Sequence, residues 1–113
     1  MTVTAKPFVD AKYAENTETT QYTATNVRAI VDKCTVTNVT GSAAVITVRI
    51  VPSGGSAGAN NAISYQKSVS AGATEVFPEI VGQIMKAGDF ISTLAGTASA
   101  LVLRISGREI SGG

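Results

Sequence analysis

AVITVRIV, residues 44–51, is the stretch of sequence that decides the fold class. Ile46, Val48 and Ile50 stand at alternate positions, and polar residues occupy the two positions between them. An alternation of apolar and polar residues with a period of two is typical of a β-strand that is buried on one face. The pattern therefore predicts a strand in which Val48 points into a core and Arg49 points toward solvent.

A second strand is predicted immediately before this one, at residues 28–39. Its apolar residues also alternate, at Ile30, Cys34 and Val36, although Asp32 interrupts that face. The residues TGS that follow this strand are typical of a turn. The two strands are therefore expected to form an antiparallel hairpin.

The rest of the chain continues as short strand patterns separated by turn residues. Strands are expected near residues 8–13, 19–24, 63–69, 74–77, 90–95 and 100–105. Alternation is expected to turn Leu101, Leu103 and Ile105 inward, and to place Tyr65 on the same side as Val69. The composition agrees, because 13 valines and 9 isoleucines against 3 leucines favour strands. Seven to nine short antiparallel strands with turns about every 8–12 residues predict an all-β fold, either a β-sandwich or a barrel.

A chain of 113 residues has the size of one domain, and its sequence divides into two parts. Residues 1–18 combine Pro7 with isolated apolar residues and a polar run, so we expect an extended N-terminal arm. Residues 19–113 carry the strand patterns and are expected to form a single β-sandwich domain. The arm cannot bury enough apolar surface alone to offset the entropy of ordering it, so we expect it to dock along a sheet edge and contact another chain. A flexible tail without a role is the alternative.

The overall charge gives little information about partners. Nine Lys and Arg residues against eight Asp and Glu residues leave a net charge of +1, and the basic residues are scattered singly along the chain. Nucleic-acid binding needs a basic excess on one face or arm, so no nucleic-acid partner is expected. No stretch approaches the roughly 18 consecutive apolar residues of a membrane span, so no membrane partner is expected either.

Four charged residues of the predicted strands have open interpretations. Arg49, Arg104 and Arg108 occupy outward positions, where they are either solvated or part of an interface, since arginine is enriched where proteins meet. Asp32 would need a partner if it is buried. We expect a structural hydrogen bond between its carboxylate and Arg28, Lys33 or backbone N–H groups.

The sequence has no histidine and a single cysteine. This excludes catalytic triads that use histidine, zinc sites that use histidine, and a disulfide within one chain. Cys34 stands on an apolar strand face and is expected to be a buried, unreactive side chain. The glycine-rich residues 53–58, SGGSAG, lack the helix and the Lys-Ser/Thr pair of a phosphate-binding loop, so they predict a loop between strands. We therefore predict that the protein is not an enzyme and has no catalytic, cofactor-binding or metal-binding residues.

Eight short stretches of turn and strand residues carry a resemblance to a known group of proteins. They are residues 28–33 (RAIVDK), 35–44 (TVTNVTGSAA), 50–58 (IVPSGGSAG), 69–72 (VSAG), 79–83 (EIVGQ), 86–91 (KAGDFI), 98–101 (ASAL) and 106–110 (SGREI). They lie between Arg28 and Ile110, a range that covers about three quarters of the chain, and this range resembles small structural proteins of tailed bacteriophages and prophages. The resemblance implies a virion component with a jelly-roll or related β-sandwich fold, acting as a head decoration, neck or tail accessory subunit. It carries over no catalytic residues and does not cover the segment up to Asn26.

The resulting hypothesis is a non-enzymatic bacteriophage virion structural protein with a jelly-roll-like fold, in the first place a capsid decoration (cement) protein that stabilises the head. The expected partners are other virion proteins, namely the major capsid protein or neck and tail proteins, and further copies of the chain in a homo-oligomer. The expected location is the virion, after synthesis in the host bacterial cytoplasm. A neck or tail accessory protein, or a receptor- or glycan-binding module, is the alternative. The loops at 52–61 and 96–99 carry none of the aromatic residues that such a module would use.

Overall fold

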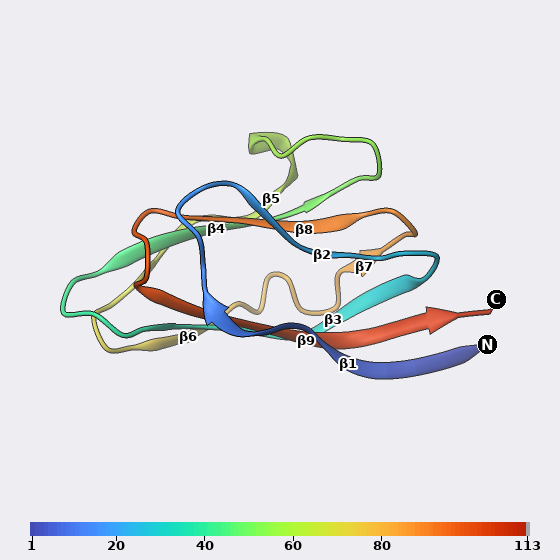
Figure 1. Cartoon of the computed structure of the whole chain (residues 1–113), viewed down its shortest axis with the longest axis horizontal. Helices are drawn as coiled ribbons and strands as arrows, with labels where there is room; N and C mark the ends of the chain where they lie inside the picture. Colours follow the sequence, from blue (N-terminus) through green and yellow to red (C-terminus); the bar gives the residue numbers. More distant parts are fainter. Residues whose placement is uncertain (113) are drawn as a thin grey trace.

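The computed structural model describes residues 1–112, so Gly113, the last residue of the expected domain 19–113, lies outside the described residues. Within residues 1–112 there are nine strands and one short 3₁₀ helix (Figure 1). The elements are β1 (Thr2–Tyr13), β2 (Thr19–Thr23), β3 (Arg28–Asn38), β4 (Ala44–Val51), η1 (Ala59–Asn61), β5 (Ala62–Val69), β6 (Thr74–Val76), β7 (Ile84–Met85), β8 (Phe90–Ala95) and β9 (Leu101–Ser111). No helix in this part of the chain has the length and apolar character needed to cross a bilayer.

The strands form two antiparallel sheets that lie face to face. The first sheet has the order β1-β9-β3-β6, with β7 also paired to β3, and the second sheet has the order β2-β8-β4-β5. The chain passes from one sheet to the other between most successive strands, and β9 lies between β1 and β3. A five-stranded and a four-stranded antiparallel sheet connected in this way form a jelly roll. The prediction of an all-β, jelly-roll-like sandwich is therefore confirmed.

The predicted hairpin between residues 28–39 and 44–51 is wrong, because the two strands lie in different sheets. β3 pairs with β9, β6 and β7, whereas β4 pairs with β5 and β8. A corner at Asn38 separates them, since its buried side-chain amide donates to the carbonyl oxygens of Ser42 and Val69 over 2.8 and 3.0 Å. This corner carries the chain across the core, so that β4 forms its hairpin with β5 instead.

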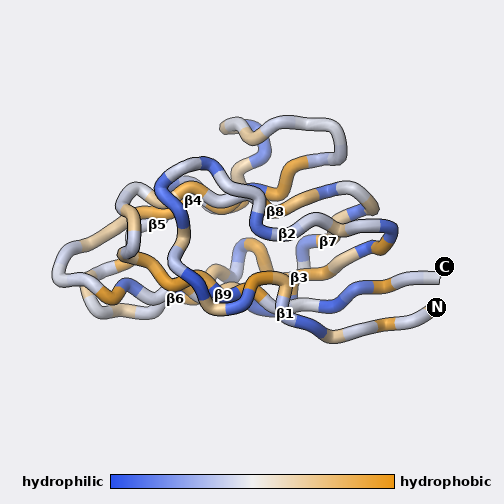
Figure 2. Tube along the Cα trace, viewed as in Figure 1, coloured by the Kyte–Doolittle hydropathy of each residue, from blue (hydrophilic) through white to orange (hydrophobic). Residues whose placement is uncertain are grey.

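The core lies between the two sheets and follows the hydrophobic segments of their strands (Figure 2). Five side chains that the sequence predicts to point inward are confirmed, because each is at most 1% exposed: Cys34, Val48, Leu101, Leu103 and Ile105. The long connection from β6 to β8 adds further buried side chains, namely Phe77, Ile80 and Met85. Complete burial of one such aliphatic or aromatic side chain contributes roughly 1.5–3 kcal/mol to the free energy of unfolding.

The polar face of β4 is covered as well, so Arg49 stands on the outward side that alternation predicts, but the prediction that it is solvated is wrong. The side chain of Arg49 is only 9% exposed. Its Nη1 donates to the carbonyl oxygen of Gly58 over 2.6 Å, and its Nε donates to Glu18 Oε1 over 3.3 Å. Glu18 Oε2 also accepts a hydrogen bond from Ser92 Oγ over 2.6 Å. These bonds attach the 52–61 loop and the β1–β2 connection to the outside of the second sheet.

A β-bulge at Asp32 changes which residues of β3 face the core. The pairing of β3 with β9 shifts between Val31 and Lys33, so that Val31 is buried before the bulge and Cys34 is buried after it. Asp32 is exposed. It accepts hydrogen bonds from Arg108, so the expected structural hydrogen bond is present, although its donor is not Arg28, Lys33 or a backbone N–H group.

A second irregularity, at Gln66 in β5, corrects the expected position of Tyr65. Gln66 has a backbone φ of 47°, which lies in the left-handed region, and its N–H donates to Thr47 Oγ1. The pairing of β5 with β4 is irregular around this residue. Val69 is consequently buried while Tyr65 is 61% exposed, so the prediction that they share one side is wrong.

Residues 1–18, expected as an arm, contribute an edge strand to the first sheet because β1 pairs with β9 along its length. Phe8 is buried, and its ring stacks on Tyr22 with 4.1 Å between the ring centroids. The Tyr22 hydroxyl donates to Glu109, and burial together with this bond raises the pKa of Tyr22. Residues 1–7 are exposed and form, with the end of β9, a ribbon that projects from the sandwich (Figure 1).

Val48→Asp should destabilise the protein severely, because Val48 is 0% exposed and a carboxylate there would have no polar partner among apolar neighbours. We expect the free energy of unfolding, measured by urea denaturation, to fall by at least about 3 kcal/mol. Val76→Asp is the matched control, since Val76 in β6 is 53% exposed, and it should cost less than about 1 kcal/mol. Equal effects of the two substitutions would show that the orientation of β4 is wrong.

Candidate functional site

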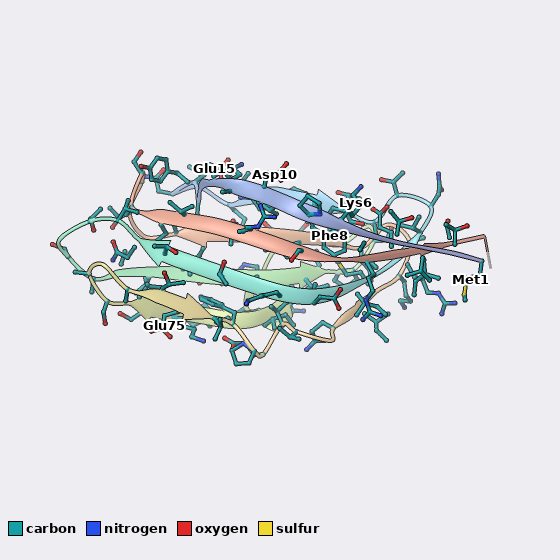
Figure 3. All side chains as sticks on the ribbon, turned by 90° about the horizontal axis from the view of Figure 1, so that it is seen from below. Met1, Lys6, Phe8, Asp10, Glu15 and Glu75 are labelled. Atoms are coloured by element: carbon teal, nitrogen blue, oxygen red, sulfur yellow. The ribbon has the colours of Figure 1, made fainter. Side chains whose placement is uncertain are left out.

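The outer face of the first sheet, meaning the side opposite the core, is the candidate functional site. Its strands β1, β9, β3 and β6 face the viewer in Figure 3. Alternation along the strands directs to it Val3, Ala5, Pro7, Asp10 and Tyr13 from β1, Val102, Arg104, Ser106, Arg108 and Ile110 from β9, Arg28, Ile30, Asp32, Lys33, Thr35 and Thr37 from β3, Thr74 and Val76 from β6, and Ile84 from β7.

Four cationic side chains lie together on the outer face. Arg104 and Arg108 come from β9, and Arg28 and Lys33 come from β3. In the antiparallel register Arg104 lies opposite Thr35, while Lys33 lies opposite Ser106. Strands that are far apart in the sequence thus bring their single basic residues onto one surface.

Two carboxylates on the outer face neutralise part of this charge. Asp32 accepts two hydrogen bonds from Arg108 Nε and Nη2, over 3.0 and 2.9 Å, and thereby raises the pKa of the Arg108 guanidinium. Asp10 lies 3.8 Å from Arg104 Nη1, with both side chains well exposed. Among the described residues neither Arg28 nor Lys33 has a carboxylate within 4.0 Å of its charged nitrogen atoms. The outer face therefore carries a positive excess.

Off the outer face the charges balance closely. The other five Lys and Arg residues are accompanied by six Asp and Glu residues. Most of them form ion pairs, namely Lys6–Glu109 at 3.5 Å, Lys12–Glu15 at 2.8 Å, Arg49–Glu18 at 3.3 Å and Lys67–Glu79 at 3.4 Å. The small net charge of the whole chain thus conceals a polarised surface.

Exposed apolar side chains accompany the cations on the outer face. Val3, Tyr13, Val76 and Ile84 are each more than half exposed. Aromatic, aliphatic and arginine side chains in close proximity are typical of protein–protein contact surfaces. This arrangement can bind a complementary surface that presents carboxylates and apolar groups.

A shallow hollow of about 250 Å³ lies within the outer face, lined by Lys33, Thr35, Arg104 and Ser106. All four side chains can donate hydrogen bonds. A second hollow of about 350 Å³ lies at the β2–β3 turn and residues 87–88, where the lining side chains are small, apolar or neutral. The first hollow is thus the one that combines a depression with charge.

Sequence reasoning placed Arg104 and Arg108 on an outward face but did not find the cationic cluster. The available signal was their spacing of four residues, which puts both on one side of a strand. Lys33 lies on the same face because it neighbours the inward Cys34, as alternation predicts.

Arg28 and Ile30 reach this face because the bulge at Asp32 reverses the alternation before it, so the prediction that Ile30 points inward with Cys34 is wrong. The bulge leaves no pattern in the local sequence.

The remaining buried polar groups have structural partners. Asp89 Oδ1 accepts a hydrogen bond from the Ser53 N–H over 3.0 Å, and its Oδ2 accepts one from the Lys86 N–H over 2.9 Å. Asp89 therefore joins two turns. In residues 1–112 no group of three or more Cys, Asp or Glu side chains is arranged to hold a metal ion.

Cys34 is buried at the predicted inward position. Desolvation, reinforced by the charge of Glu79, raises the pKa of its thiol to about 12. The nucleophilic form of cysteine is the thiolate. The structure therefore makes Cys34 an unreactive part of the core.

Comparisons with known proteins show likeness at the level of the fold. No protein-family model matches the chain, and no curated protein sequence matches it. A solved structure of Bacillus endospore appendages, described as a novel family of disulfide-linked pili, is similar with a TM-score of 0.58 and 14% identity, over 99% of this chain and 90% of that chain. A structure of infectious bursal disease virus, strain Gx, is similar with a TM-score of 0.52 and 15% identity, over 99% of this chain but only 32% of that chain. These likenesses agree with the jelly-roll sandwich of the chain.

Cys34 should react with the thiol reagent DTNB only when the protein unfolds, because the buried thiol with its raised pKa is hardly ionised at pH 8. The measurement is the labelling rate as a function of urea concentration. A Cys34→Ala/Thr74→Cys double variant is the control, since position 74 is exposed and its thiol should label at once. Fast labelling of the folded wild-type protein, independent of urea, would contradict the burial of Cys34.

Proposed function

We propose that this protein is a non-enzymatic structural component of a bacteriophage virion, and that it decorates the capsid. The observation that carries the proposal is the outer face of the first sheet, where Arg28, Lys33, Arg104 and Arg108 lie among exposed apolar side chains on a rigid jelly roll. Such a face binds an acidic and partly apolar surface. The proposed partner surface belongs to the major capsid protein, with neck or tail proteins as the other virion partners.

Stabilisation of a shell follows from binding alone. A ligand that binds the assembled state and not the dissociated state stabilises it by RT ln(1 + [L]/Kd), which amounts to about 2.7 kcal/mol when the ligand is present at 100 times Kd. A small rigid domain loses little conformational entropy of its backbone on docking. These properties suit a cement protein that spans the contacts between shell subunits.

The comparisons support a role in a protein assembly. The two similar structures are described as pili and as a virus, and the sequence stretches between residues 28 and 110 resemble virion components of tailed phages. The disulfide linkage in the description of the pili has no counterpart here, because Cys34 is the single cysteine and is buried. Contacts between copies of this chain are accordingly proposed to be noncovalent.

Contacts between copies are the second part of the proposal. Of the expected arm, residues 1–18, the first seven residues are exposed and lie on the projecting ribbon. The edge of β1 that faces away from β9 leaves backbone groups available to another strand. We propose that this part of the arm contacts a neighbouring copy and produces a homo-oligomer on the particle.

One observation favours the alternative of a neck or tail accessory protein that binds a receptor or glycan. Tyr65 on the edge strand β5 is 61% exposed, and Tyr13 on β1 is 51% exposed. Exposed aromatic rings are the side chains on which sugars stack, and they also occur in protein interfaces. These two tyrosines lie on different sheets and do not form one platform, so capsid decoration remains the first proposal.

The test uses phage particles produced from the genome that encodes the chain. Immunogold electron microscopy should label the head, and Arg28→Glu should lower the occupancy of the particles at least about tenfold, because it puts a carboxylate into the cationic face. Lys86→Glu is the control, because it changes the charge by the same amount at an exposed residue that does not belong to the outer face. It should leave the occupancy of the particles unchanged. Label on the neck or tail would support the alternative, and particles without the protein would overturn the proposal.

A further inference from the structure

We propose that the hollow formed by Lys33, Thr35, Arg104 and Ser106 is a binding site for a single carboxylate, supplied by an Asp or Glu side chain of the partner protein. The proposal rests on the proposed function, because it names the group on the partner surface that the outer face receives. Three observations support it: the register of β3 with β9, the net positive charge around Lys33 and Arg104, and the hollow between these side chains.

The register of β3 and β9 places the four side chains at the corners of one rectangle. Lys33 lies directly opposite Ser106, and Thr35 lies directly opposite Arg104. The two cations thus occupy one diagonal and the two hydroxyls the other, with diagonal neighbours roughly 7–8 Å apart at their Cα atoms. A carboxylate above the centre lies within reach of both cations and of the hydroxyl groups.

The hollow exists because short side chains separate the long ones. Thr35 and Ser106 occupy two corners with small hydroxyl-bearing groups, while Lys33 and Arg104 extend from the other two. The result is a depression of about 250 Å³ whose four side chains are all hydrogen-bond donors. Such a set of donors matches an oxyanion, which has acceptors only.

The neighbouring acids select a monovalent ligand. Asp32 is engaged by Arg108 and does not compete for Lys33. Asp10 lies 3.8 Å from Arg104 Nη1, so Lys33, Arg104 and this carboxylate together carry one net positive charge. A carboxylate, with a single negative charge, neutralises this excess, whereas a phosphate dianion would exceed it and be repelled by Asp10.

The outer face already binds carboxylates in the same manner. Arg108 holds Asp32 through two nitrogen atoms, at distances of 3.0 and 2.9 Å, and lies on β9 four residues from Arg104. Arginine binds a carboxylate with two parallel hydrogen bonds when the geometry allows it. Arg104 has only the longer contact to Asp10, so its guanidinium can accommodate a further carboxylate.

The test is a titration of the isolated protein with a peptide, in which ¹⁵N–¹H NMR spectra record the amide chemical shifts at each step. The probe is a blocked tripeptide, N-acetyl-Gly-Glu-Gly-amide, in which the Glu side chain is the single carboxylate. We expect saturable shifts at the amides of residues 33–35 and 104–106 with roughly millimolar affinity, because two charge-assisted hydrogen bonds hold the carboxylate. The same peptide with Gln in place of Glu should produce no saturable shifts.

Variants separate this site from general electrostatics. Lys33→Met and Arg104→Met should each weaken binding of the Glu peptide at least about fivefold, through the loss of one charge-assisted hydrogen bond. Lys86→Met, which removes a charge off the outer face, should leave the affinity unchanged. The spectra themselves report whether each variant is folded.

Three outcomes would overturn the inference. They are the absence of saturable shifts at residues 33–35 and 104–106, equal binding of the Glu and Gln peptides, and tighter binding of inorganic phosphate than of the Glu peptide. Failure of the site is distinguishable from failure of the proposed function. If particles bind the Lys33→Met and Arg104→Met variants as well as they bind the wild-type protein, the protein attaches to virions without using this site. If the Glu peptide binds the protein but the protein does not attach to particles, the carboxylate site exists and the proposed function is wrong.

Discussion

The ladder between β3 and β9 is the constraint on which the rest of the structure depends. It pairs residues 28–38 with residues 101–110 through the centre of the first sheet. One side of the ladder supplies Leu103 and Ile105 to the core, and the other side supplies the cations of the outer face. A change of register by one residue would exchange these two sides, so the same hydrogen bonds determine both the packing and the binding surface.

Local alternation predicted the fold class and much of the core, but not which strands pair. Leu101, Leu103 and Ile105 were predictable because β9 alternates there without interruption. The hairpin of β3 with β4 was wrong because period-two alternation carries no information about the sheet to which a strand belongs. The burial of Arg49 was missed for a related reason, since a loop and a connection from elsewhere in the chain cover that face of β4.

The candidate site was predictable only in part. The outward direction of Arg104 and Arg108 follows from the alternation along β9. Because arginine is enriched in protein contacts, the sequence also indicated that these side chains are either solvated or part of an interface, without deciding between the two. The gathering of Lys33 and Arg28 beside them depends on a pairing across about seventy residues and, for Arg28, on the bulge at Asp32. Scattered charges in a sequence therefore do not exclude a concentrated charge on a face when the fold is a sandwich with non-local strand pairs.

The position of β9 between β1 and β3 has a consequence for synthesis in the cell. Of the three long strands of the first sheet, the one made last is inserted between two that were made earlier. Until the ribosome has released residues 101–111, β1 and β3 lack their common neighbour and expose unpaired backbone edges. Such edges favour aggregation, and pairing over long sequence distances is slow. The nascent chain therefore completes its fold only after residues 101–111 have left the ribosome, and a chain truncated before β9 would be a substrate for chaperones and proteases rather than a partly functional domain.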